Sequence, residues 1–207
     1  MRGIDHIVYC TTDLDKEVKE LEQKLGISIT YGGKHLNRGT HNAVFKIGHS
    51  TYFEILAADP QNKEVPPPRW MGIDSIQKAR ITRWAIVPEN IEQSASILEQ
   101  YKEGYGSIQS GSRALDGGGE LIWQLTDPLP KPQIEVVPFL LNWEGSIHPT
   151  KNMPDACSLE QIRIVHPDPY LIATTFESLK IEIPILKGEN ERIEISLKTP
   201  NGLITLS

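Results

Sequence analysis

The stretch Ile4-Asp5-His6-Ile7-Val8-Tyr9-Cys10-Thr11-Thr12-Asp13-Leu14 decides the fold, because it runs from a short apolar strand into a capped helix. Thr12 or Asp13 can serve as the N-cap, since both side chains accept hydrogen bonds from the first turn. Apolar residues then recur at helical spacing as far as Gly26, a residue type that favours a helix end. The spacing predicts a helix of about three turns with one buried face.

Three extended segments follow this helix, at residues 27–31, 42–47 and 50–57. Two later stretches, 81–91 and 159–169, copy the opening layout of strand, break and helix cap. The three caps, Asp13, Asn90 and Asp168, are 77 and 78 residues apart. Such regular spacing indicates one βαβββ unit that is used repeatedly and buries its sheet face against its neighbours.

The chain therefore divides into three modules with two connections. The further strands of the later modules are expected at 107–113, 120–126, 136–143, 192–198 and 203–206, with Asp116-Gly117-Gly118-Gly119 as a hairpin turn. The predicted boundaries are 1–58 for the first module, 59–79 for a proline-rich linker, 80–145 for the second module, 146–158 for a connecting loop and 159–207 for a third, βαβββ-like module. The fold class is α+β.

Composition excludes several classes of function. The chain of 207 residues is 39% hydrophobic and 23% charged, with a net charge of −6 and no run of Lys or Arg that would hold a phosphate backbone. We expect neither a nucleic-acid partner nor a membrane span, since no stretch of about 18 apolar residues occurs. Cys10 and Cys157 lack the spacing of a disulfide framework, which favours the cytoplasm.

The opening strand and the strand Tyr52-Phe53-Glu54 together resemble the vicinal-oxygen-chelate superfamily, and within it the glyoxalase-like domain group. Further segments carry the same resemblance: Gly32-Gly33-Lys34-His35, Gly39-Thr40-His41-Asn42-Ala43, Pro68-Arg69-Trp70, Pro138-Phe139-Leu140-Leu141-Asn142-Trp143, His148-Pro149 and His166-Pro167-Asp168-Pro169. The resemblance implies paired βαβββ modules whose sheets curl into an open half-barrel with a ligand or a metal in the cup.

The same resemblance implies that His6 and Glu54 occupy the metal-ligand places of the first module. An imidazole and a carboxylate suit one divalent ion such as Zn, Fe, Ni or Mn, and a cup without metal is the alternative. Arg83 stands where the second module would carry its equivalent of His6, and a guanidinium has no lone pair to give. The place of Glu54 falls at residues 140–142, where Asn142 is a weak ligand. The sequence thus departs from the four-ligand pattern.

Candidate substrate-binding residues lie in loops and at strand ends. His35, His41 and Asn42 belong to a polar segment before a strand, where recognition groups are often placed. Arg83 could clamp an anionic group or pair with Glu54 across the sheet. Asn142 and Trp143 complete the predicted set.

Other conspicuous residues have a structural reading that we favour. Trp70, Trp123 and Trp143 with Phe139 could line an aromatic pocket, although aromatic side chains on strands more often belong to a core. His148 and His166 precede prolines and are expected to be structural, and Cys10 has no neighbouring base that would make it a nucleophile.

Two functions remain open. The first is a lyase, isomerase or dioxygenase that acts on a small oxygenated substrate, with His6 and Glu54 as metal ligands or as the catalytic base. The second is a metal-free protein that binds or sequesters a small molecule. In either case the expected partner is a small molecule. The chain could in addition form a homodimer.

Overall fold

The computed structural model describes residues 3–114 and 120–207, so the expected glycine turn at 116–119 lies outside the described residues. Its first half contains, in order, β1 (Ile4–Thr11), α1 (Leu14–Leu25), β2 (Thr30–His35), the 3-10 turn η1 (Leu36–Arg38), β3 (Thr40–Gly48), β4 (Thr51–Ala58) and the 3-10 segment η2 (Trp70–Ser75). The second half contains β5 (Arg80–Ile86), α2 (Ile91–Tyr101), β6 (Ile108–Ala114), β7 (Glu120–Thr126), β8 (Phe139–Asn142), η3 (Pro149–Asn152), β9 (Ser158–His166), α3 (Pro169–Ser178), β10 (Ile185–Lys187), β11 (Arg192–Thr199) and β12 (Gly202–Leu206).

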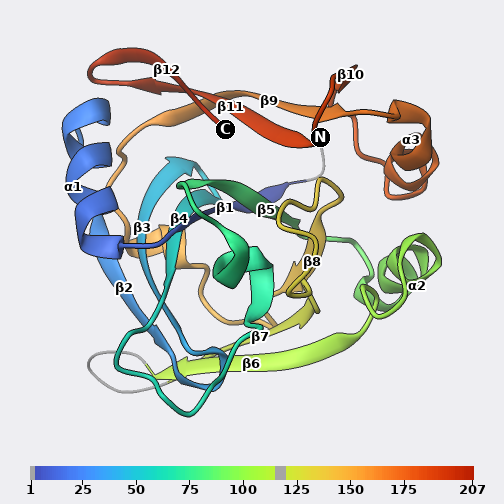
Figure 1. The fold of residues 1–207 in the computed structure, drawn as a ribbon, viewed down its shortest axis with the longest axis horizontal. Coiled ribbons are helices and arrows are strands. Elements are labelled where there is room, and N and C mark those ends of the chain that lie inside the picture. The colour runs from blue at the N-terminus through green and yellow to red at the C-terminus, as the bar shows by residue number, and fades with distance from the viewer. Residues whose placement is uncertain (1–2, 115–119) are drawn as a thin grey trace.

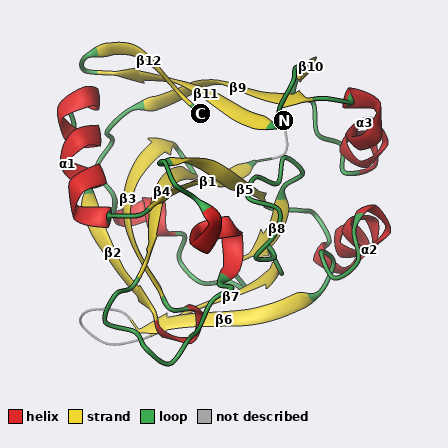
Figure 2. Cartoon of the chain, viewed as in Figure 1, coloured by secondary structure: helices red, strands yellow, loops and turns green. Residues whose placement is uncertain are grey.

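An eight-stranded sheet in the order β2-β3-β4-β1-β5-β8-β7-β6 forms the body of the molecule. Each half repeats one topology, in which the first strand pairs in parallel with the fourth, β1 with β4 and β5 with β8. The antiparallel pair of β1 and β5 joins the halves at the centre. Figures 1 and 2 show the sheet curling back on itself. The predicted α+β half-barrel of βαβββ modules is confirmed.

The helix caps lie where the repeat predicts them. Asp13, Asn90 and Asp168 are the N-caps, and their side chains accept hydrogen bonds from backbone N–H groups of the first turns of α1, α2 and α3. Gly26 ends α1 with a φ of 73°, in the left-handed region that suits glycine. The amphipathic spacing and these caps therefore fix the three helices locally.

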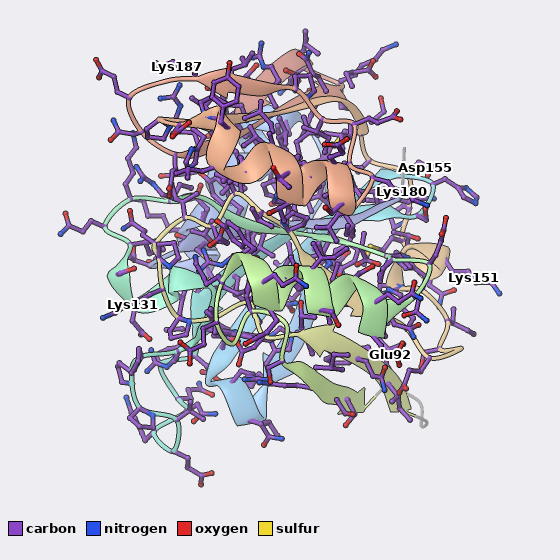
Figure 3. The ribbon with its side chains drawn as sticks, turned by 90° about the vertical axis from the view of Figure 1, so that its right-hand side faces the viewer. Glu92, Lys131, Lys151, Asp155, Lys180 and Lys187 are labelled. Carbon is purple, nitrogen blue, oxygen red and sulfur yellow. The ribbon has the colours of Figure 1, made fainter. Side chains whose placement is uncertain are left out.

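The third unit repeats the element order but not the sheet order. Its strands are arranged β10-β9-β11-β12, so the first strand β9 lies between β10 and β11 instead of beside the last strand. The difference arises because the short return after α3 brings β10 back parallel to β9. This second sheet contacts β5 through β11, and α3 lies beside α2 (Figure 3). One continuous apolar core includes residues from both sheets.

Two predicted strands have shifted bounds. β2 begins at Thr30 and extends to His35, because residues 33–35 pair with residues 40–42 of β3. β8 begins only at Phe139, because the carbonyl groups of Val136 and Val137 accept hydrogen bonds from the Trp84 and Tyr105 side chains. None of the described helices is long and apolar enough to cross a membrane.

The turn before β12 completes the first helix. Asn201 donates through Nδ2 to the carbonyl oxygens of Gln23 and Lys24 at the C-terminus of α1, at 3.1 and 3.2 Å. A Cβ on Gly26 would lie 2.7 Å from the Asn201 side chain, so glycine is needed there for space as well as for its φ. The helix end that has no partner within α1 is thus satisfied by the second sheet.

Candidate functional site

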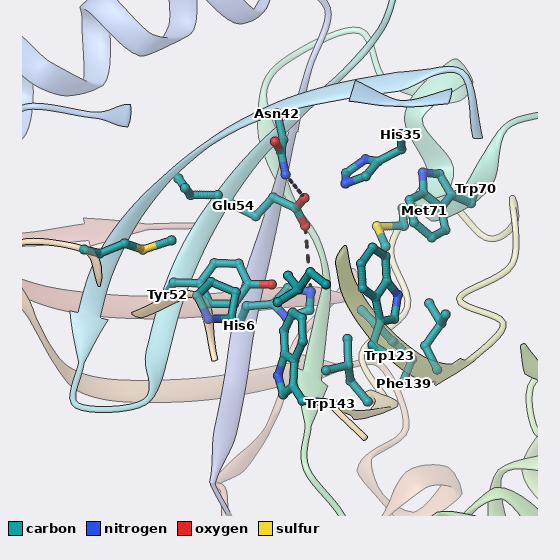
Figure 4. A pocket seen from close by; sticks show the side chains of 16 residues that line it. His6, His35, Asn42, Tyr52, Glu54, Trp70, Met71, Trp123, Phe139 and Trp143 are labelled. Atoms are coloured by element: carbon teal, nitrogen blue, oxygen red, sulfur yellow. Dashed lines mark hydrogen bonds and ion pairs between the residues drawn. The ribbon is translucent and has the colours of Figure 1, made fainter. Parts of the chain in front are cut away.

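A pocket opens on the concave side of the eight-stranded sheet and contains about 600 Å³ of empty space, part of which is open to solvent. Both halves of the sheet contribute to its walls, together with η2 and the loops after β8 (Figure 4). The lining residues are His6, His35, Asn42, Val44, Tyr52, Glu54, Trp70, Met71, Leu121, Trp123, Leu125, Phe139, Leu141, Trp143, Pro149 and Met153.

Glu54 lies at the floor of the pocket. In the register of β3, β4 and β1, Glu54 is opposite Val44 and Val8, so strand alternation places the side chains of Asn42 and His6 on its face of the sheet. Glu54 is 5% exposed, and its Oε1 accepts a hydrogen bond of 2.6 Å from Asn42 Nδ2. Its Oε2 lies 3.7 Å from His6 Nε2. The first module thus brings its imidazole and its carboxylate together.

Asp5 holds the other side of the His6 ring. The register of β1 against β5 shifts between Ile4 and His6, and at this bulge His6 Nδ1 donates to Asp5 Oδ1 at 2.6 Å. Complete burial alone would raise the pKa of Asp5, but hydrogen bonds and charge from His148 and His6 outweigh it and lower that pKa to about 2. An ionised Asp5 keeps the proton of His6 on Nδ1, so that Nε2 faces Glu54.

His148 supports Asp5 from the loop after β8. The backbone N–H of Thr150 donates to His148 Nδ1 at 3.2 Å, which assigns the proton of a neutral ring to Nε2. That nitrogen lies 3.1 Å from Asp5 Oδ2, and Trp143 Nε1 donates to the same oxygen at 2.8 Å. Sequence reasoning treated His148 as structural and missed Asp5. Asp5 had a local signal, its place beside His6. His148 belongs to a segment that carries the family resemblance, but its contact with Asp5 has no local signal, because 143 positions separate the two residues.

Aromatic rings form the walls above this polar floor. Tyr52 stacks on His6 at 4.8 Å between ring centroids, and Phe139 meets the His6 ring edge-on at 5.4 Å. Trp123 and Trp143 pack together at 5.8 Å on the opposite side. These rings belong to the core or pack against it and also line the pocket, so the two readings of the aromatic residues are compatible.

A second aromatic group stands where the two ends of the sheet approach each other. His35 meets Trp70 edge-on at 5.6 Å, and Thr40 Oγ1 lies within hydrogen-bond distance of both rings. The Arg38 guanidinium stacks 4.8 Å from the centre of the Trp70 ring and donates to Gln109 of β6. This contact connects η1, next to one edge strand, to the other edge strand of the sheet.

Five of the eight predicted site residues line the pocket and three do not. His6, Glu54, His35, Asn42 and Trp143 are among the lining residues.

The other three, His41, Arg83 and Asn142, are absent from the pocket lining. His41 lies beside Asp59 and Lys34, with its pKa lowered chiefly by burial. Asn142 accepts a hydrogen bond from the backbone N–H of Glu144.

Arg83 is fully buried, and all five of its N–H donors go to main-chain oxygens rather than to Glu54 or a ligand. Nε donates to Pro128, Nη1 to Thr82 and Gln133, and Nη2 to Leu129 and Pro132. The guanidinium thus anchors the loop between β7 and β8 and has no donor left for an anionic substrate.

The donor set does not fit the metal that the superfamily often binds. Among the described residues, no group of three His, Cys, Asp or Glu side chains is placed to hold an ion. His6 Nε2 and Glu54 Oε2 offer two donors, whereas protein sites for such ions use three or four. The repeat adds no ligand, because Arg83 is fully engaged and Asn142 lies outside the lining.

A family model described as a glyoxalase-like domain matches residues 4–180 of the chain. No curated protein matches the sequence. Among solved structures, a hypothetical protein from Staphylococcus aureus is 18% identical with a TM-score of 0.62, covering 99% of this chain and 84% of that one. Methylmalonyl-CoA epimerase from Mycobacterium tuberculosis is 12% identical with a TM-score of 0.41, covering 67% and 85%.

Proposed function

The chain belongs to the glyoxalase-like domain family of the vicinal-oxygen-chelate superfamily, and we propose that it catalyses proton transfer, as an isomerase or a lyase, on a small oxygenated substrate in the pocket. Glu54 is the proposed base and His6 the proposed acid. Asn42 and Asp5 hold these two groups in place.

Buried Glu54 is the observation that carries the proposal. A carboxylate that is 5% exposed is costly to keep unless it is paired or used. Its partners are one amide donor at 2.6 Å and an imidazole at 3.7 Å, and the described part of the pocket lining contains no Lys or Arg. Buried carboxylates with few partners in a cleft are candidates for catalytic bases.

The proposed step moves one proton in each direction. Glu54 Oε2 removes a proton from a carbon next to a carbonyl group. The electron pair of the broken C–H bond forms a C=C bond, and the π pair of the carbonyl group moves to its oxygen. His6, protonated at Nε2, gives its proton to that oxygen, and an enol forms. In an isomerisation, the O–H proton returns to His6 and a proton returns to a different carbon or face. In a lyase reaction, the O–H proton returns to His6, the carbonyl group re-forms, and a leaving group departs with its bonding pair from the carbon next to the deprotonated one.

Asp5 contributes by stabilising the protonated His6 ring, since its ionised oxygen already accepts the Nδ1 proton. The aromatic walls contribute by excluding water, which strengthens the polar interactions at the floor. The step requires no metal ion. We therefore expect activity to survive dialysis against a chelator, and restoration by Zn, Fe, Ni or Mn of activity lost in that dialysis would contradict this part of the proposal.

The test uses tryptophan fluorescence to find small carbonyl compounds that bind, because Trp70, Trp123 and Trp143 line the pocket. Each binder is then incubated with enzyme in D2O, and proton NMR measures exchange of its acidic C–H. We expect Glu54→Gln to lower the exchange rate at least about 100-fold, as loss of a positioned base does. Glu92→Gln, an exposed change on α2 (Figure 3), is the matched control.

A metal-free binding protein is the second candidate, favoured by the mostly apolar and aromatic lining of the pocket. If the protein only binds its ligand, carbonyl compounds bind, but the C–H protons of none of them exchange faster than in buffer alone. Exchange that is equal in the wild type and in Glu54→Gln would also contradict the enzymatic proposal.

A further inference from the structure

We propose that the pocket selects a positively charged substrate, one that carries a protonated amine or another ammonium group near the reacting carbon. The inference rests on the proposed function and adds to it the chemical class of the substrate. It follows from three features of the pocket: the charges of its floor, the placement of the nearby arginines and the nature of its walls.

The floor contains two buried carboxylates and, among the described lining residues, no Lys or Arg that would neutralise them. Asp5 and Glu54 have exposed fractions of 0% and 5%. His6 Nδ1 and His148 Nε2 both hydrogen-bond to Asp5. Among the described residues, Glu54 has no cationic group within hydrogen-bond distance, since His6 Nε2 lies 3.7 Å from its Oε2. An anionic group placed there would meet unscreened repulsion in a site of low polarity.

The arginines near the pocket do not reverse this charge. Arg83 lies outside the lining, and all five of its N–H groups donate to main-chain oxygens. Arg38 lies over Trp70 and donates to Gln109, whose own amide donates to Asp127 at 2.6 Å. Neither side chain is part of the lining, and no Lys or Arg is among the lining residues that the structure describes.

The walls supply a second attraction for a cation. The faces of aromatic rings carry partial negative charge and bind ammonium groups, most strongly when the rings are tryptophans. Tyr52, Trp123 and Trp143 surround the space above Glu54, and Trp70 stands at its far side (Figure 4). Several rings around one buried carboxylate form a site that suits a cation better than a neutral molecule of the same shape.

A positive charge at this place also serves the proposed chemistry. An ammonium nitrogen next to the reacting carbon withdraws electrons and makes its C–H group more acidic. The same charge attracts the carboxylate of Glu54, which is the group proposed to remove the proton. The positive charge of the substrate would therefore serve both its recognition and its activation.

Three probes of similar shape and different charge test the inference at pH 7: benzylammonium, benzyl alcohol and benzoate. Binding is measured by tryptophan fluorescence, with Trp84 as a constant background because it is fully buried outside the lining. We expect benzylammonium to bind at least about tenfold more tightly than benzyl alcohol, which is the scale of one desolvated cation–π contact, and benzoate to bind most weakly.

Two variants assign the preference to the named groups. Glu54→Gln should reduce the preference for benzylammonium over benzyl alcohol several-fold and leave only the part that the aromatic rings supply, whereas Glu92→Gln should leave the wild-type ratio unchanged. Trp123→Leu should weaken benzylammonium several-fold, and Trp123→Phe, which keeps a ring, should weaken it less. Circular dichroism verifies that each variant is folded.

Equal binding of the ammonium and the alcohol would overturn the inference, as would tighter binding of benzoate or failure of benzylammonium to bind. A preference of the same size in Glu54→Gln as in the wild type would overturn it as well. The proposed function would fail differently, through absence of Glu54-dependent C–H exchange. Glu54-dependent exchange of neutral carbonyl compounds, together with equal binding of the probes, would leave the proposed function intact and reject the charged substrate.

Discussion

The two halves of the eight-stranded sheet share one topology and differ in what their first strands carry. In the first half, β1 carries His6, whose Nε2 faces a buried carboxylate with too few partners. In the second half, β5 carries Arg83 at the equivalent place in the repeat, and its five donors all meet main-chain oxygens. The same backbone thus holds one incompletely paired polar group and one completely paired group.

The difference separates stability from function within one repeated unit. A buried polar group that is fully paired stabilises the segment that pairs with it, here the loop between β7 and β8. A buried carboxylate with few partners costs stability and is kept where it can act on something else. We therefore expect substitutions at Arg83 to unfold the protein and substitutions at Glu54 to disable it.

The largest effect is expected at Arg83. Arg83→Met should lower the free energy of unfolding by about 3–5 kcal/mol, because five carbonyl oxygens lose their donor. Arg83→Lys, which keeps the charge with fewer donors, should lose less. Urea denaturation measures both, with the exposed change Arg192→Met as the control. If Arg83→Met is as stable as the wild type, the proposed structural role of Arg83, and with it the difference between the two halves, is contradicted.

Asp5 should produce the next largest effect, and one that depends on pH. Its pKa in the folded state, about 2, lies below the ordinary 3.8, so its contribution is present above about pH 4 and disappears as the pH falls through 2. This contribution of Asp5 to the free energy of unfolding is about 2 kcal/mol.

Asp5→Asn should therefore be less stable than the wild type at pH 7, and the gap should narrow toward pH 2. Urea denaturation at pH 7, 4 and 2.5 measures the gap, and the exposed change Glu92→Gln should follow the wild type. A gap that stays constant across this range would show that the shape of the side chain matters rather than its charge.

The helix caps test the part of the comparison in which the halves agree. Asp13→Ala and Asn90→Ala should each cost about 1 kcal/mol of unfolding free energy, since each side chain satisfies one backbone N–H of its helix. Thermal unfolding measures both against the exposed helical change Glu20→Ala. Costs that differ several-fold would show that the two helices are held by different means.

The smallest change in stability is expected at Glu54. Glu54→Gln should alter the free energy of unfolding by less than about 1 kcal/mol, in the stabilising direction, because it removes a buried charge and keeps an acceptor for Asn42. The same variant should no longer catalyse exchange of the acidic C–H proton of a bound carbonyl compound. A loss of stability similar to that of Arg83→Met would place Glu54 among the structural groups.

The sequence predicted the repeated part of the fold because its signals are local. Caps at Asp13, Asn90 and Asp168 and apolar spacing in the helices depend on a few neighbouring residues, and the structure confirms them. The order of strands in the last sheet has no local signal, since the position of β10 depends on how the chain returns after α3. The sequence did not predict strand registers or bulges either, such as the bulge beside Asp5.

The candidate site could be predicted only where its residues follow the strand pattern. His6 and Glu54 belong to the segments that carry the family resemblance, and both line the pocket. His148 reaches Asp5 through a tertiary contact across 143 positions, which no spacing reveals. Arg83 was predicted either to clamp a substrate or to pair with Glu54, because the sequence does not show that carbonyl groups of residues 128–133 accept its hydrogen bonds.

The contact between Asn201 and the end of α1 has a consequence for the order in which the protein assembles. The carbonyl oxygens of Gln23 and Lys24 precede Asn201 by 178 and 177 positions, so they leave the ribosome long before it does. During synthesis, the first helix therefore lacks this partner until the turn before β12 has emerged. Until then the C-terminal end of α1 stays open.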